Sequence, residues 1–288
     1  MDKILTYLRT GQHPGIRAIN SQGGALLPLT MAEKIHERAS VLYPLTGLLS
    51  MDFVNSNKVN IPFYKSGVSL SWLEEGTPYT PTSMEMDGVL FRLKKTAASF
   101  KVSEETILDS AFDIEGLLVE TFAHDLGQQL EDVYINGDGI GKPAGFLDNC
   151  TKIPAAGAAL TYTDVKALFD TLGIEYMANS AWLIAKETFS LLSETTTTGG
   201  NPVIQLNDSQ EPGAPGGYIL SRPCYITAMP TDYPLAFGAF NNYKVLQTIP
   251  VVQRLHEKYA NTGYTGFLMR GFIDGHLLKP ESVIALSV

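Results

Sequence analysis

Apolar and polar positions alternate in two runs early in the chain, and each run predicts a β-strand. The apolar positions are Val59, Ile61 and Phe63 in the first run and Val89, Phe91 and Leu93 in the second, with Phe100 and Val102 further on. The connection, residues 65–88, is rich in Gly, Ser, Thr and Pro and contains the sequence Trp72-Leu73-Glu74-Glu75-Gly76. We expect a long hairpin whose tip contacts something outside the subunit, because an isolated hairpin cannot bury a Trp. The alternative is a tip folded back onto its own core.

The longest helical pattern covers residues 113–135. Its apolar residues recur every three or four positions and form one stripe: Ile114, Leu118, Phe122, Leu126, Leu130 and Val133. Asp113 is a suitable N-cap, and Asn136-Gly137 is a suitable end. Such a helix is about 35 Å long. Its acidic residues lie mostly off the stripe, so we expect one packed face and one negative face.

The rest of the pattern predicts shorter elements. Residues 1–24 predict an extended arm, and Thr30-x-x-Glu33 is a capping box that predicts a short helix. Residues 151–262 have the pattern of a separate α/β unit. Its elements are a helix capped by Thr163, a buried strand at 181–185, and strands at 218–227 and 235–240. Residues 273–288 predict a closing strand interrupted by Pro280.

Composition predicts a folded, soluble chain. It has 288 residues, of which 44% are hydrophobic and 18% charged, and a chain of this size buries roughly three quarters of its unfolded surface. It has no apolar run of about 18 residues and no secretory signal at its start. Its two cysteines, Cys150 and Cys224, cannot build a disulfide framework, so we expect reduced thiols and assembly in a reducing compartment.

The negative charge is concentrated in one segment. The chain has a net charge of −9, whereas residues 103–148 contain eleven acidic residues and one Lys, which gives −10 and leaves the rest at +1. A general nucleic-acid binder needs a basic face, so this balance argues against one.

The sequence contains several incomplete catalytic motifs. His36-Glu37 and His256-Glu257 begin like a zinc-protease motif, but Ser40 and Ala260 stand where the second His is required. Residues 67–71 approach a nucleophile elbow without its last Gly, and residues 137–143 approach a phosphate loop but follow a helix instead of preceding one. We therefore expect no enzyme activity, no metal and no cofactor, and we expect residues 137–145 to be a turn.

Several short motifs resemble, in the same order, those of the major capsid protein family of tailed bacteriophages, which has the Hong Kong 97-type fold. The matching stretches are Tyr7–Gly11 with Gly23–Pro28, Val59–Pro62 with Trp72–Gly76, Lys101–Ser110, Asp132–Gly145, Tyr218–Cys224 and Arg270–Leu286. Asp132–Gly145 (DVYINGDGIGKPAG) is the most specific, whereas Ser221 and Cys224 depart from the family pattern. The resemblance covers nearly the whole chain.

The resemblance implies an α+β fold, the Hong Kong 97-like capsid fold, in five parts. These are an N-terminal arm and entry to the P domain (1–54), the E-loop and the following P-domain strand (55–102), the spine helix of the P domain (103–150), the A domain (151–262) and a return to the P domain (263–288). It also implies pentamers and hexamers of an icosahedral shell that encloses double-stranded DNA without binding it specifically. Portal, scaffold and decoration proteins are the other implied partners. The expected location is the virion, assembled in the bacterial cytoplasm, with no membrane contact.

Three sets of residues follow from that resemblance as site candidates. E-loop residues expected at a subunit interface are Lys65, Trp72, Leu73, Glu74 and Glu75. Basic residues expected to meet the two glutamates on a neighbour are Arg254, Lys258 and Arg270. Acidic residues expected to line the shell interior, where they would repel packaged DNA, are Glu115, Glu120, Asp125 and Glu131. Residues 263–288 contain no Asn, so we expect no isopeptide cross-link from Lys58 or Lys65.

Two other functions are kept as alternatives. One is an encapsulin, a bacterial shell of the same fold that encloses a cargo enzyme. The other, more remote, is an enzyme with an unrecognised site. The contents of purified particles distinguish the first from a phage head, and a strictly monomeric chain with turnover would favour the second.

Overall fold

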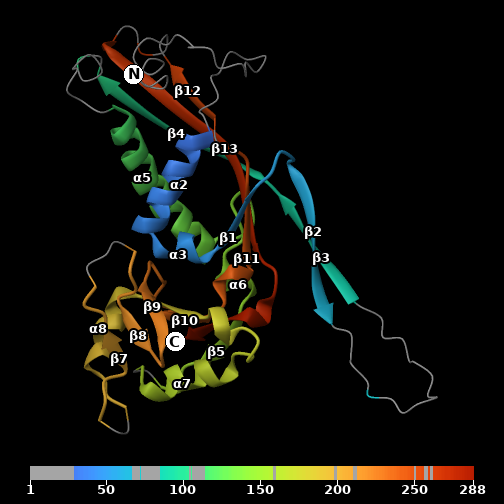
Figure 1. Cartoon of the computed structure of the whole chain (residues 1–288), viewed down its shortest axis with the longest axis vertical. Helices are drawn as coiled ribbons and strands as arrows, with labels where there is room; N and C mark the ends of the chain where they lie inside the picture. Colours follow the sequence, from blue (N-terminus) through green and yellow to red (C-terminus); the bar gives the residue numbers. More distant parts are fainter. Residues whose placement is uncertain are drawn as a thin grey trace.

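The computed structural model describes most of the chain after its first 28 residues. The described ranges are 29–66, 72, 85–103, 105, 114–157, 160–197, 200–209, 213–249, 251–255, 259 and 262–288. The predicted N-terminal arm lies outside them. The described part is α+β, with two sheets, a helical layer and a projecting two-stranded ribbon (Figure 1).

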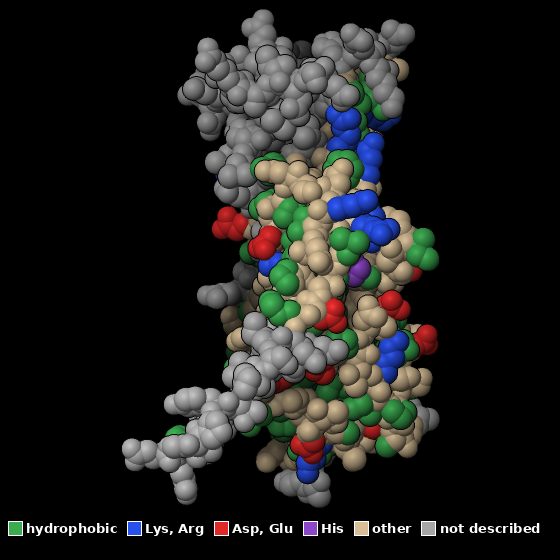
Figure 2. All heavy atoms as spheres, turned by 90° about the vertical axis from the view of Figure 1, so that its right-hand side faces the viewer, with side chains coloured by type: hydrophobic (Ala, Val, Ile, Leu, Met, Phe, Trp, Pro, Cys, Tyr) green, Lys and Arg blue, Asp and Glu red, His purple; other side chains and the backbone are tan. Residues whose placement is uncertain are grey.

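A five-stranded sheet forms the elongated half of the protein. Its strands are β1 (Ser50–Phe53), β4 (Lys94–Ser103), β11 (Tyr243–Gln247), β12 (Val251–Leu255) and β13 (Tyr264–Leu277). The long strand β13 pairs antiparallel with β4, β11 and β12, and β1 joins β11 in parallel. One face carries the helical layer, and Lys and Arg side chains gather along the upper half of the opposite side (Figure 2).

The helical layer consists of α2 (Leu29–Leu42), α3 (Pro44–Leu48) and α5 (Ile114–Asn136). The bounds of α5 confirm the predicted long helix within one residue, and its end at Asn136 confirms the predicted stop. A helix around Ile35 and Ala39 was also predicted, and both side chains are buried in α2. In α5, Phe122 is buried, but Leu126 and the rest of the stripe toward the C-terminal end are only half-buried.

A seven-stranded sheet forms the other half. Its strands, in spatial order, are β5 (Thr151–Pro154), β14 (Val283–Ser287), β10 (Leu235–Gly238), β6 (Ala181–Ile184), β9 (Arg222–Ile226), β8 (Gly217–Ile219) and β7 (Ile204–Leu206). Helices α7 (Tyr162–Thr171) and α8 (Lys186–Glu194) accompany it. The predicted strand at 181–185 is confirmed, since all four residues of β6 are buried. Trp182 stacks on Phe237 with ring centroids 4.0 Å apart.

Two local predictions for this half were wrong. Residues 218–227 form two strands, because Leu220 and Ser221 adopt positive φ angles of 48° and 62° and turn the chain between β8 and β9. The cap of α7 is Thr161 and not Thr163: the Thr161 backbone N and Oγ1 both donate to the Asp164 carboxylate. The capping box therefore begins two residues earlier than predicted.

The strand pairing also crosses the expected boundary at residue 262. β11 and β12 lie within residues 151–262, yet they belong to the five-stranded sheet. β14 lies within residues 263–288, yet it pairs with β10 and β5 in the seven-stranded sheet. The two halves therefore exchange segments, which a linear division of the sequence cannot represent.

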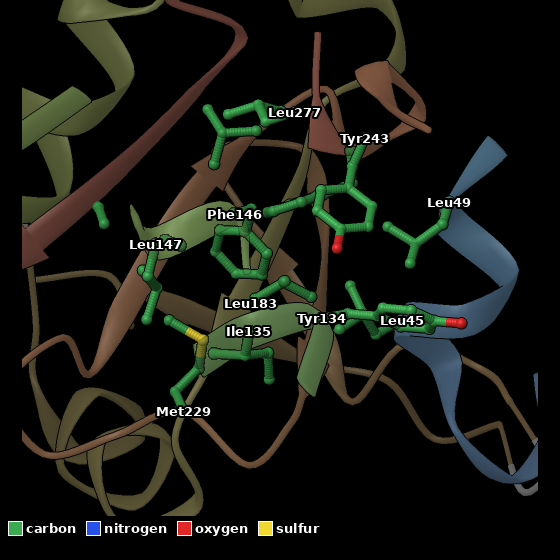
Figure 3. Packing of buried hydrophobic residues seen from close by; sticks show 14 of the residues in the cluster. Leu45, Leu49, Tyr134, Ile135, Phe146, Leu147, Leu183, Met229, Tyr243 and Leu277 are labelled. Atoms are coloured by element: carbon green, nitrogen blue, oxygen red, sulfur yellow. The ribbon is translucent and has the colours of Figure 1, made fainter. Parts of the chain in front are cut away.

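A shared core joins the two sheets to α3, α5 and the short helix α6 (Phe146–Asn149) (Figure 3). Tyr134 from α5, Tyr243 from β11 and Phe146 are fully buried in it. Leu183 of β6 and Leu277 of β13 bring both sheets into the same cluster. Continuous apolar packing, and not a linker, therefore joins the two halves.

Candidate assembly interface

A two-stranded ribbon, β2 (Lys58–Ser66) and β3 (Glu85–Arg92), projects from the body of the protein (Figure 1). It confirms the predicted hairpin strands. The register pairs Ile61 with Val89, so apolar residues of both strands share one face. On the other face Met86 and Leu90 are 59% and 46% exposed. A ribbon without a second layer cannot bury such side chains itself, which leaves them accessible to a partner.

Trp72, between the two strands of the ribbon, has 91% of its surface exposed. It therefore does not fold back onto the core of its own chain. Lys65 lies in β2, but its side chain, like the whole of Leu73, Glu74 and Glu75, is outside the described residues. An exposed Trp of this size is typical of a contact surface.

The root of the ribbon is fixed to β13 by Asp274, whose carboxylate is buried. Oδ2 accepts the backbone N–H of Arg92 and Oδ1 accepts the ammonium of Lys94, both at 2.8 Å. The His276 ring lies 3.3 Å from the same carboxylate and packs edge-on against Phe91. Burial alone would raise the pKa of Asp274, but the hydrogen bonds from His276, Lys94 and Arg92 outweigh it and lower that pKa.

Asp274 was not among the predicted site residues. Its sequence signal is an acidic residue inside a strand pattern, Phe272-Ile273-Asp274-Gly275-His276. A buried acid in a strand requires partners, but the partners here come from residues about 180 positions away. The sequence alone gives no means of finding them.

Two of the three candidate basic residues lie on paired strands of the five-stranded sheet. In the register of β12 and β13, position 254 pairs with Phe267 and position 251 pairs with Arg270. Lys258 is outside the described residues. Of the three, only Arg270 has a described side chain, and it is half-buried.

Exposed cations also lie along β4. Lys95 and Lys101 are both exposed on this strand, and we call these two residues the β4 basic strip. Lys101 Nζ lies 4.8 Å from the centre of the Tyr264 ring, a cation–π contact. The strip adds positive charge to a face that sequence analysis did not single out.

The predicted acidic face of α5 is only partly present. Asp125 is exposed beside His124, at 3.0 Å. Glu120 is exposed but paired with Arg38 of α2 through two hydrogen bonds of 2.7 and 2.9 Å. These bonds lower the pKa of Glu120. The side chain of Glu115 is outside the described residues.

The assignment of Glu131 to an exposed acidic face was wrong. Only 6% of its surface is exposed, and its Oε1 is buried without a hydrogen-bond partner in the structure. Tyr43, between α2 and α3, packs over the neighbouring turn at Gly127 and interacts electrostatically with Glu131. Burial raises the pKa of Glu131 to about 7.

The loop after α5 is a turn, as predicted. The backbone N–H of Gly145 donates to the carbonyl of Gly137 at 2.7 Å, and the Ala144 N–H donates to Gly275 of β13 at 3.1 Å. A Cβ on Gly137 would overlap the Pro143 carbonyl, and one on Gly145 would overlap the Ile135 carbonyl. The glycines therefore permit a close backbone crossing that ties the end of α5 to the sheet.

The described residues contain no candidate metal cluster and no activated thiol. They contain no group of three or more His, Cys, Asp or Glu side chains arranged to hold a metal ion. Burial raises the pKa of Cys150 to about 11 and that of Cys224 to about 12, so neither is an activated thiol. In the same part of the chain, no helix is long and apolar enough to cross a membrane.

Comparison with known proteins gives a consistent result. The family model of the phage capsid family matches residues 23–288. The major capsid protein of Klebsiella oxytoca phage phiKO2 is 24% identical over 220 residues, which cover 72% of this chain and 50% of that protein. The chain thus spans about half the length of this curated relative.

Solved capsid structures share the fold. A capsid chain of the native GTA particle, computed with C5 symmetry, superposes with a TM-score of 0.67 at 21% identity over 98% of both chains. A chain of Microbacterium phage Oxtober96 superposes with a TM-score of 0.61 at 14% identity over 94% of both. The α+β arrangement of sheets, long helix and ribbon is that of the Hong Kong 97-like capsid proteins. This chain belongs to the phage capsid family.

Proposed function

We propose that this chain is the major capsid protein of a phage or phage-like particle. It self-assembles into pentamers and hexamers of an icosahedral shell that encloses double-stranded DNA in the virion. Family membership supports this proposal. The single structural observation that carries it is the projecting ribbon, whose exposed Trp72, Met86 and Leu90 have no partner surface within a ribbon of two strands. Repeated copies of a modest contact give a stable shell, because each subunit is held by several neighbours.

The ribbon tip is the proposed E-loop contact with a neighbouring subunit. Glu74 and Glu75 are the only charged residues of 67–84, so a partner surface with cations complements them. Arg270 is one such cation on the five-stranded sheet, and Lys65 flanks the tip in sequence. Portal protein and any scaffold or decoration proteins would contact other surfaces of the same shell.

For the lining of the shell interior, we propose a less acidic face of α5 than the sequence predicts. Asp125 is exposed on α5, whereas Arg38 neutralises Glu120 and Glu131 is inside the protein. A helical face with few net charges neither grips nor strongly repels phosphate. Enclosure of DNA without specific binding still follows from it, because no dense basic surface faces the genome from α5.

Expression of the chain in bacteria followed by electron microscopy tests the proposal. Shells, or isolated pentamers and hexamers, are the expected result on sizing columns and in micrographs. DNA-filled heads in the presence of the packaging machinery would support a phage capsid, whereas protein-filled cages would indicate an encapsulin. A chain that stays monomeric under all salt and pH conditions would contradict both.

A further inference from the structure

A groove of about 280 Å³ lies between the C-terminal half of α5 and the five-stranded sheet. Its helix wall is formed by Leu126, Leu130 and Val133, all of which are only half-buried. Its sheet wall includes Met269 of β13 and Ala98 of β4. Because protein interiors are normally close-packed, these half-buried apolar side chains leave room between helix and sheet for the apolar part of a ligand.

A second, smaller cavity of about 70 Å³ adjoins the groove. The two share Leu126, Leu130, Gln247 and Met269 in their linings. Most of the lining of the smaller cavity is apolar and includes the buried ring of Phe122. A Met side chain is unbranched and flexible, so rotation of Met269 would lengthen the apolar space from the groove into this cavity.

The groove also has a cation at its mouth. Lys142, in the loop after α5, lines the groove and is exposed. The other lysine of the lining, Lys94, is already bonded to Asp274 at 2.8 Å. None of the described residues that line the groove is acidic. An anionic group at the mouth would therefore meet a cation and no competing carboxylate of the lining.

Volume and charge together define the class of ligand. The volume is near the lower limit of small-molecule sites, about 300 Å³, which favours a slender ligand over a bulky one. From Leu126 to Val133 the groove follows about 10 Å of helix, at 1.5 Å per residue. A single apolar chain that ends in one anionic group fits both the narrow apolar walls and the positive mouth.

We propose that this groove binds a fatty acid of medium chain length, with its carboxylate beside Lys142 and its acyl chain between α5 and the sheet. The end of the acyl chain lies toward Met269 and the smaller cavity. The site is formed within one subunit, so the inference goes beyond the capsid function and does not depend on it. A ligand that binds only the folded chain stabilises it, so the bound fatty acid holds α5 against the sheet.

Titration calorimetry of the purified full-length protein with dodecanoate, below its micellar concentration, tests the proposal. We expect one dodecanoate per subunit and a higher Tm in its presence. From octanoate to dodecanoate the affinity should rise by up to about fourfold per methylene, which corresponds to about 0.8 kcal/mol for each fully buried CH₂. Dodecanol and dodecyltrimethylammonium are the matched ligands without a negative charge, and both should bind more weakly.

Two variants locate the site. Lys142→Glu should weaken dodecanoate about fivefold or more and leave dodecanol unchanged, whereas Lys101→Glu, an exposed cation outside the groove, should change neither. Ala98→Phe places a ring in the groove and should abolish binding of every chain length. Its control is Ser99→Phe, because Ser99 is exposed and adjacent residues of a strand point to opposite faces. Circular dichroism verifies that each variant is folded.

Three results would overturn the assignment. One is the absence of dodecanoate binding by the wild-type protein. Another is uptake of several molecules per subunit with equal affinity in Lys142→Glu and Ala98→Phe, which would indicate adsorption to the surface only. The third is binding to isolated capsomers that is lost in intact shells, since protein would then fill the groove in the particle. Each of these results leaves the capsid function intact, because shell formation is measured separately.

Discussion

The Lys94 ammonium lies 2.8 Å from Oδ1 of Asp274, and this pair joins the first strand after the ribbon to the longest strand of the sheet. The Asp274 side chain is 1% exposed and the Lys94 side chain 18% exposed. The same carboxylate accepts a hydrogen bond from the backbone N–H of Arg92, which is the last residue of β3. One buried acid therefore determines where the ribbon leaves the body, and hence the direction in which its exposed apolar residues are presented.

Replacement of that acid is expected to be costly. Asp274→Asn leaves the Lys94 charge without its partner in a largely buried place, and breaking such a pair costs about 3 kcal/mol or more. Urea unfolding monitored by circular dichroism measures the change in the free energy of unfolding. Assembly should also fall, because the ribbon loses its fixed root.

The matched control is Asp52→Asn. Asp52 pairs with Lys244 at 2.6 Å, but its side chain is 56% exposed. Exposed pairs contribute about 1 kcal/mol or less. Equal losses of stability in the Asp52 and Asp274 variants would contradict the role given to Asp274.

Glu131 is expected to make the stability of the protein depend on pH with a sign opposite to that of Asp274. Its pKa is raised in the folded state to about 7 from 4.5, so the folded protein binds more protons than the unfolded chain between these values. Stability should therefore decrease as the pH rises from about 5 to 8, by up to about 3 kcal/mol. The contribution of Asp274, whose pKa is lowered, is constant in this window and is lost only in more acidic solution.

Glu131→Gln is expected to flatten this profile and to raise the Tm at pH 8, since an amide carries no charge to bury. Thermal unfolding at several pH values makes the comparison. Asp125→Asn is the control, because Asp125 lies on the same helix but is exposed. A wild-type profile that rises from pH 5 to 8, or a slope that survives in Glu131→Gln, would contradict the assignment.

Local pattern was enough to predict the elements but not their partners. The apolar stripe predicted α5 nearly to the residue, because helical spacing is a local property of the sequence. Glu131 lies off that stripe, yet it is buried and interacts electrostatically with Tyr43, which lies between α2 and α3. The exchange of β14 between halves is non-local in the same way. The ribbon and Trp72 were predicted as an interface feature, whereas the contacts of Asp274 depend on packing between distant segments.

The loop after α5 offers a test of backbone crowding. Gly145→Ala would place a methyl group against the Ile135 carbonyl and the Gly137 N–H, neither of which is a flexible side-chain end. We expect a loss of several kcal/mol in the free energy of unfolding, or insoluble protein, as for other overpacked sites. Gly157→Ala is the control, since nothing lies within 4 Å of a Cβ there. Similar stabilities for the two variants would contradict the close crossing described for this loop.

Trp72 provides a direct optical reading of assembly. The chain has two Trp residues: Trp182 is fully buried, whereas Trp72 is 91% exposed. In unassembled subunits, acrylamide should therefore quench about half of the Trp emission, that of Trp72. On assembly this accessible fraction should fall several-fold, because the proposed interface buries the indole. Trp72→Phe removes the quenchable fraction and identifies the signal. Equal quenching before and after assembly would show that Trp72 stays in solvent and takes no part in the subunit contact.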